Sequence, residues 1–145
     1  HAKDYVEMQW MMLQQETPED FVIASGKQYS VKEFIVWSAE ALGIQLEFSG
    51  EGLNETAKVK SVHGNKAPAL KVGQIIVKID ERLFRPAEVD TLLGDASKAK
   101  KLLNWETTIS PQEMCIEMID EDYKAAKRQV LLMDHSLNLP LENDR

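Results

Sequence analysis

The sequence of 145 residues contains a single cysteine, Cys115, and three histidines, His1, His63 and His135, that lie far apart. One cysteine excludes an internal disulfide and is typical of a reducing cytosol, so we expect a cytoplasmic protein. Cys115 falls on the apolar face of a predicted helix, where a thiol is buried rather than nucleophilic. No histidine has a ligand at i+3 or i+4 together with a second partner, and we predict no metal site.

The glycines of this chain do not have the spacing that binds a dinucleotide cofactor. The seven glycines are Gly26, Gly43, Gly50, Gly52, Gly64, Gly73 and Gly94. Their spacing cannot form G-x-G-x-x-G, the loop that holds a pyrophosphate at a helix N-terminus. The chain also has no nucleophile elbow. We therefore predict that this chain contains no cofactor-binding residue and no catalytic residue.

Long apolar runs and an excess of basic residues are also missing. No run approaches the roughly twenty residues needed to cross a bilayer. Lysine and arginine number 17 against 24 acidic residues, for a net charge of −7. This balance argues against a nucleic acid or an anionic membrane as a partner. The chain shows no leader and no initiator methionine, so we expect it to start within a longer protein or after processing.

Helical spacing of apolar residues predicts four helices, over residues 4–15, 31–42, 96–103 and 111–130, and Asp95 is the predicted cap of the third. Ser30 with Glu33, and Ser110 with Glu113, have the spacing of capping boxes that begin the second and fourth helices. The side chains expected to be buried by the last three helices and the residues around them are Phe34, Ile35, Trp37, Ala41, Leu102, Leu103, Trp105, Cys115, Met118, Ile119, Tyr123 and Ala126.

Short apolar or alternating runs predict strands over residues 21–24, 46–48, 57–62 and 74–79. The last two flank a loop that contains Pro68, which indicates a β-hairpin. The lysines in and around this hairpin are Lys58, Lys60, Lys66, Lys71 and Lys78. They could form a phosphate-binding patch, but a solvated hairpin face is the favoured interpretation. The prediction is thus an α+β fold, mainly helical with short strands and a β-hairpin, with a domain over 1–130 and a tail over 131–145.

The run from Phe84 to Val89 is the most informative stretch for function. Pro86 suits the first position of a helix, which would place Glu88 in the first turn and Arg85 at its mouth. A guanidinium there can bind a phosphate, and a carboxylate can accept hydrogen bonds from sugar hydroxyls. The alternative is a surface ion pair at the start of an ordinary helix, since most such pairs contribute little.

Several blocks of the sequence carry a resemblance to a known family. They are His1 to Val6, Gln9 to Gln14, Pro18 to Ala24, Gln28 to Val31, Leu42 to Ile44, Phe84 to Asp95 and Leu103 to Trp105. Over roughly residues 1 to 130 the chain resembles the C-terminal part of a GDP-mannose 4,6-dehydratase, which is an extended short-chain dehydrogenase/reductase.

The resemblance implies a substrate-binding half whose Rossmann half is absent from this chain. It implies a lyase of GDP-fucose biosynthesis that converts GDP-mannose to GDP-4-keto-6-deoxymannose. In that reaction, NADP takes a hydride from C4, water is lost across C5 and C6, and the hydride returns to C6. NADP and the catalytic residues would belong to the missing half, and the full enzyme would be a homo-oligomer. The fragment alone is expected to be inactive.

The resemblance implies a role for each of two residues, by their positions in the matching motif. The match over Arg85, Pro86, Ala87 and Glu88 implies that Arg85 neutralises the diphosphate of GDP-mannose and that Glu88 accepts hydrogen bonds from the ribose hydroxyls. Tyr123 and Lys127 also spell the family's Tyr-x-x-x-Lys pair. We interpret that match as coincidence, because the pair lies in a charged C-terminal helix with no glycine loop to bring a nicotinamide near it.

Two other interpretations remain open at this point. One is a non-catalytic domain of the same ancestry that binds nucleotide sugars or another protein. The other is a related epimerase or dehydratase that acts on a different nucleotide sugar. A glycine fingerprint and a Tyr-x-x-x-Lys pair upstream of His1 would distinguish an enzyme from a binding domain.

Overall fold

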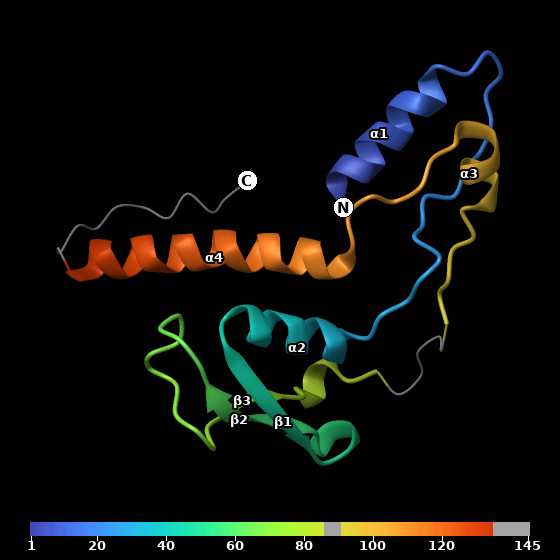
Figure 1. Ribbon diagram of the computed structural model, residues 1–145. Helices are drawn as coiled ribbons and strands as arrows, with labels where there is room; N and C mark the ends of the chain where they lie inside the picture. The colour runs from blue at the N-terminus through green and yellow to red at the C-terminus, as the bar shows by residue number, and fades with distance from the viewer. Residues whose placement is uncertain (86–90, 135–145) are drawn as a thin grey trace.

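A computed structural model of the protein describes residues 1–85 and 91–134 (Figure 1). The elements in chain order are α1 (Ala2–Leu13), α2 (Val31–Ala41), β1 (Ile44–Ser49), the 3-10 turn η1 (Gly52–Asn54), β2 (Thr56–Val62), β3 (Ile75–Lys78), the 3-10 turn η2 (Glu81–Leu83), α3 (Ser97–Leu103) and α4 (Pro111–Asp134). Within the described ranges these are four α-helices and one three-stranded sheet, so the predicted α+β, mainly helical class is confirmed.

Figure 1 separates the chain into two regions. The sheet region consists of the three strands, α2 and α4, with α2 lying between the sheet and α4. The helical region consists of α1, α3, the extended segment 21–24 and the loop 104–110, and it forms the upper right of the view. The segments 25–30 and 91–96 run between the two regions, and α4 begins where α1 begins, beside the N-terminus.

The sheet is antiparallel throughout, with strand order β1-β2-β3. Ile44 pairs with Val62 and Phe48 with Ala57, and β2 pairs back onto β3, which confirms the predicted hairpin. The turn from α2 into β1 requires a glycine at Gly43, which has φ of 78°. A Cβ atom there would collide with the His63 carbonyl. Ala39, Ile44 and Val59 form the core of this region.

The core of the helical region is built around Trp105, which is only 2% exposed, as the sequence predicted. Met8, Ala99 and Leu103 pack with it, and Phe21 and Ile23 lie against this cluster. Both predicted capping boxes form: Ser30 N–H donates to Glu33 at 2.7 Å, and Ser110 N–H donates to Glu113 at 2.8 Å. The buried state of Cys115 is also confirmed.

The strand predicted over 21–24 is wrong for this structure. The segment is extended, but it pairs with no strand in the described parts of the chain, and Val22 is 50% exposed. An apolar run becomes a strand only where a neighbour supplies backbone partners, and none of the three strands reaches it.

Several predicted helix faces also differ from the structure. Leu102, Met118 and Ala126 are exposed, and Phe34, Ile35, Trp37 and Ala41 are only half-buried. Each of these helices packs against its neighbours along a narrow stripe only, whereas the apolar periodicity of the sequence predicts burial of a wider face.

The ends of two helices also differ from the prediction. Asp95 does not occupy the capping position of α3, which belongs to Ala96, although its carboxylate accepts from Ser97 N–H at 2.8 Å. Helix α4 continues past residue 130 to Asp134, so the division at 130/131 remains a prediction.

Candidate functional site

Arg85 lies two residues after the end of η2, and its side chain is exposed. The turn is capped by Asp80, whose Oδ1 accepts from Arg82 N–H at 3.0 Å. The same carboxylate binds the Arg82 guanidinium as a fork, with Nε–Oδ1 at 3.1 Å and Nη2–Oδ2 at 2.7 Å. The turn that precedes Arg85 is therefore held by contacts that do not involve Arg85.

The ion pair of this turn does not involve Arg85. Hydrogen bonds to Asp80 raise the pKa of Arg82, and the same bonds lower the pKa of Asp80. Arg82 and Asp80 thus satisfy each other, since a bidentate guanidinium–carboxylate pair is the strong form of this contact. Arg85 forms no ion pair with any carboxylate in residues 1–85 and 91–134. The predicted phosphate-binding cation is therefore exposed and not committed to a described partner.

The second predicted residue, Glu88, lies outside the described residues, as does Pro86. The chain is described again from Thr91, and 91–96 is not helical. There Leu92 N–H donates to Gln28 Oε1 at 3.3 Å. Gly94 follows, and a Cβ atom at that position would lie 2.7 Å from Ala24 Cβ. The segment 92–94 therefore lies directly on the 22–28 stretch.

A cavity of about 430 Å³ opens beyond Gly94, and it does not include Arg85. Residues of three segments line it: 24–29, 94–97 and 105–111, together with Lys100 and Glu113. Most of its charged groups already have partners, because Lys100 pairs with Glu106 at 2.7 Å and Ser110 with Glu113. The size of the cavity suits a small ligand. Few of its charged side chains, however, lack a hydrogen-bond or ion-pair partner within the protein.

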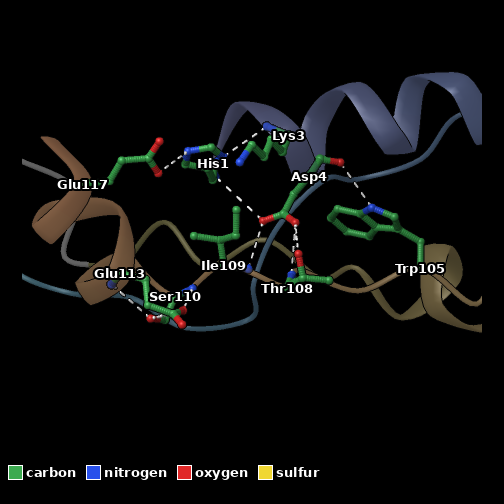
Figure 2. Close-up of polar contacts among 9 residues, drawn as sticks. All are labelled: His1, Lys3, Asp4, Trp105, Thr108, Ile109, Ser110, Glu113 and Glu117. Carbon is green, nitrogen blue, oxygen red and sulfur yellow. Dashed lines mark hydrogen bonds and ion pairs between the residues drawn. The ribbon is translucent and has the colours of Figure 1, made fainter. Parts of the chain in front are cut away.

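Figure 2 shows a polar cluster that the sequence did not reveal. Asp4 is 1% exposed, and its carboxylate accepts from Thr108 Oγ1 at 2.7 Å, Thr108 N–H at 3.1 Å and Ile109 N–H at 3.4 Å. Its backbone carbonyl accepts from Trp105 Nε1 at 3.2 Å. Asp4 stands in the His-Ala-Lys-Asp block that resembles the family, and this block was the only sequence signal for it.

The electrostatics of Asp4 suit a structural role. Burial alone would raise the pKa of this carboxyl, but the hydrogen bonds from Thr108 and Ile109 outweigh burial and lower the pKa. The carboxylate therefore stays charged and satisfied, and it holds the loop that leads into α4. No buried polar side-chain atom in the described chain lacks a partner.

Tyr123 and Lys127 lie on α4 in the sheet region. Lys127 Nζ is 5.2 Å from the centre of the Tyr123 ring, and Lys66 Nζ is 5.8 Å from it. Lys66 also donates to the Ala41 carbonyl at 3.1 Å and pairs with Asp120 at 3.6 Å. Tyr123 thus takes part in packing the hairpin loop against α2 and α4, and its dismissal as a catalytic residue remains a prediction.

Residues 1–85 and 91–134 contain no cluster of three or more His, Cys, Asp or Glu side chains that could hold a metal ion. No helix in the same ranges is both long enough and apolar enough to cross a membrane.

Comparison with known proteins places the chain in a family. The family profile described as GDP-mannose 4,6 dehydratase matches residues 1–118. The chain is 60% identical over 141 residues to GDP-mannose 4,6-dehydratase of Vibrio cholerae, which covers 97% of this chain and 38% of the relative. It is 53% identical over 141 residues to the enzyme of Yersinia enterocolitica, with 97% and 38% covered. It is 41% identical over 122 residues to the Homo sapiens enzyme, with 84% and 30% covered.

These relatives are nucleotide-sugar dehydratases, and this chain aligns with only part of each of them. The chain belongs to the GDP-mannose 4,6-dehydratase family. It spans about two fifths of the length of the bacterial relatives described above.

Proposed function

We propose that this chain is the substrate-binding part of a GDP-mannose 4,6-dehydratase of the extended short-chain dehydrogenase/reductase type. The full enzyme converts GDP-mannose to GDP-4-keto-6-deoxymannose. The observation that carries the proposal is Arg85, an exposed guanidinium without a described carboxylate partner, which follows a turn held by the Asp80–Arg82 fork. Membership of the family supports the choice of substrate.

In this proposal, Arg85 binds the diphosphate and Glu88 accepts hydrogen bonds from the ribose. A guanidinium binds phosphate oxygens through two parallel N–H donors, so it orients the diphosphate as well as neutralising it. Binding energy gained at the nucleotide, away from the reacting carbons, can position the hexose for reaction. Glu88 enters by its position in the sequence, beside the Arg85 that the structure describes.

The redox chemistry belongs elsewhere in the proposed enzyme. NADP supplies hydride transfer when it is bound, but the residues of this chain do not fit it, because its glycines form no dinucleotide fingerprint. We therefore assign NADP and the catalytic residues to the Rossmann half. The isolated chain should give no GDP-4-keto-6-deoxymannose when it is supplied with GDP-mannose and excess NADP. Turnover above background would show that catalytic residues lie within residues 1–145.

The surface of α1 supports a partnership with that half. Val6, Trp10 and Leu13 form a stripe at helical spacing, and Trp10 is 62% exposed and Leu13 82% exposed. Val22, on the neighbouring extended segment, is exposed as well. An apolar stripe of this kind marks a buried contact in the intact protein. We assign the stripe to the Rossmann half, and we expect the complete enzyme to be a cytoplasmic homo-oligomer.

The proposal is tested by changing Arg85 in the full-length protein. A charge-assisted hydrogen bond to phosphate contributes about 1.5–3 kcal/mol, so Arg85→Ala should weaken GDP-mannose binding roughly ten- to a hundredfold. Arg85→Lys should recover only part of the affinity, because an ammonium keeps the charge but loses the fork. Glu88→Gln should cost less, since an amide oxygen still accepts from a hydroxyl.

A matched arginine serves as the control. Arg128 lies on α4, is exposed, and has no ion-pair partner in the described chain. Arg128→Ala should leave GDP-mannose affinity unchanged, and both alanine variants should bind NADP as the parent does. Calorimetric titration with GDP and with NADP measures each affinity. If Arg85→Ala binds GDP as tightly as Arg128→Ala, Arg85 is an ordinary surface arginine and the proposed role is wrong.

A further inference from the structure

A small groove opens beside His1, between the start of α1, the segment 23–25 and the loop that leads into α4. Its volume is about 130 Å³, and we call it the entry groove. The exposed α1 stripe of Val6, Trp10 and Leu13 does not line it, so the two surfaces are distinct. The side chains that line the entry groove are mostly apolar, namely Tyr5, Ile23, Ala24, Ile109, Pro111 and Met114.

The serine hydroxyls in the wall of the entry groove already have partners. Ser25 Oγ donates to the Lys27 carbonyl at 3.2 Å and accepts from the Lys27 N–H at 3.3 Å. Ser110 Oγ donates to Glu113 at 2.7 Å and accepts from the Glu113 N–H at 3.2 Å. A polar ligand would gain little from these walls, whereas an apolar side chain would be removed from water. Because an apolar cavity of about 150 Å³ can hold benzene, the entry groove has room for one side chain of the size of leucine or phenylalanine.

His1 is fixed at the rim of the entry groove, as Figure 2 shows. Its Nδ1 accepts from the Lys3 N–H at 3.2 Å, and its Nε2 lies 3.2 Å from Glu117 Oε2 on α4. Its backbone nitrogen lies 4.0 Å from Asp4 Oδ2, the oxygen that accepts the N–H of the groove residue Ile109. The position of the His1 backbone nitrogen is therefore set by contacts with both α1 and α4.

We propose that the entry groove binds an apolar side chain from the three residues that precede His1 in the full-length protein. The inference rests on the proposed function, in which the Rossmann half precedes this chain. Three residues of extended chain reach roughly 10 Å, which is enough to fill a groove that His1 itself lines. Attachment to His1 also gives this segment an effective concentration that a separate molecule does not have.

The docked side chain anchors the end of the Rossmann half to two helices at once. Tyr5 belongs to α1, and Pro111 and Met114 belong to the first turn of α4, and all three line the groove. One apolar side chain in the groove therefore sets how the preceding half joins this chain.

Disulfide trapping in the full-length protein tests the identity of the occupant. A cysteine is introduced in turn at each of the three positions that precede His1, together with Met114→Cys in the groove. A disulfide needs Cα atoms about 4.4–6.8 Å apart, so mild oxidation should link at least one of the three positions to position 114. All variants carry Cys115→Ser, whose hydroxyl keeps Ser38 Oγ as a neighbour, because Cys115 Sγ and Ser38 Oγ are 3.2 Å apart. Mass spectrometry of unreduced peptides identifies the linked pair.

Met118 provides the matched control for the trapping. It lies one turn after Met114 on α4, is 49% exposed, and does not line the groove. Met118→Cys should form no link with any of the three positions, although its exposure favours reaction. No link to position 114, or equal links to positions 114 and 118, would overturn the inference. A link between two molecules, seen as a dimer without reductant, would assign the groove to a second copy and would overturn it as well.

Hydrogen exchange in the full-length protein gives a second test without introduced cysteines. Met114→Ala removes part of the groove wall and should accelerate exchange of the three amides that precede His1 about tenfold or more. Met118→Ala should leave these amides unchanged, and the Val59 N–H should keep its protection in both variants. Equal acceleration by the two substitutions, or equal acceleration at Val59, would contradict docking in the groove. Neither test depends on GDP-mannose, so a failure of the proposed function is detected separately by the GDP titration of Arg85→Ala.

Discussion

The two regions of the molecule satisfy their backbone in different ways. In the sheet region the strands pair with one another, so the core around Ile44 and Val59 contains only apolar side chains. In the helical region the loop 104–110 pairs with no strand of the described chain, and the buried Asp4 carboxylate accepts two of its N–H groups, those of Thr108 and Ile109. For these two groups Asp4 does what a neighbouring strand does for β2. The order of this irregular loop therefore depends on very few side chains.

The largest effect should come from emptying the core of the helical region. Trp105→Ala removes a buried indole together with its hydrogen bond to the Asp4 carbonyl, and should cost about 3–5 kcal/mol of unfolding free energy. Val59→Ala in the sheet region should cost less, about 1.5–3 kcal/mol. Urea unfolding of the full-length protein measures both. A smaller cost for Trp105→Ala than for Val59→Ala would reverse the comparison between the regions.

Removing the buried carboxylate should come next. Asp4→Ala removes the acceptor of the partly buried N–H groups of Thr108 and Ile109, at a cost of about 1–3 kcal/mol. Asp4→Asn keeps one oxygen and should cost less. Asp122→Asn, at an exposed position of α4, is the control and should have no effect. Amide hydrogen exchange should accelerate at Thr108 and Ile109 while Val59 stays protected, and equal acceleration at all three would contradict a local role.

The same carboxylate predicts a pH dependence confined to one region. The pKa of Asp4 in the folded protein is below its ordinary value of 3.8. A lowered pKa contributes stability that is complete above the unfolded value and is lost as the pH falls through the folded one. The protection factor of the Ile109 N–H should therefore fall below about pH 4 in the parent, and this fall should be absent in Asp4→Asn. An identical acid response in the two proteins would assign it to other groups.

The capping boxes should behave alike, because they use the same local geometry at the starts of α2 and α4. Ser30→Ala and Ser110→Ala should each cost about 1 kcal/mol. Ser30→Thr and Ser110→Thr should retain most of the stability, since each keeps the hydroxyl acceptor. Unequal costs of the two alanine substitutions, measured by thermal unfolding, would show that the tertiary setting of one helix outweighs its cap.

The smallest effect is expected for Tyr123→Phe. The substitution keeps the ring that Lys66 and Lys127 approach, and removes only the hydroxyl. Unfolding free energy should change by less than about 0.5 kcal/mol, as for most substitutions away from a core. GDP-mannose turnover by the full-length enzyme should be unaffected. Loss of turnover would mean that Tyr123 and Lys127 form a functional pair after all.

The sequence predicted the features that depend on neighbours in the chain. Both capping boxes and the hairpin of β2 and β3 were predicted from spacing alone, because the groups involved are close in sequence. The placement of Arg85 at the mouth of a helix that begins at Pro86 stays a prediction, because Pro86 lies outside the described residues. The resemblance to the family needed no structure, because it lies in the order of the residues, and the comparisons confirmed it.

Only the tertiary structure decided which apolar side chains have a neighbour and which polar groups meet. Leu102 and Leu103 are adjacent and equally apolar, yet only Leu103 faces the Trp105 cluster. The run 21–24 has strand composition but no adjacent strand in the described chain. Asp4 and Thr108 are separated by 104 positions, and Leu92 and Gln28 by 64. Local periodicity carries no information about such pairs, because they form only when packing brings distant segments together.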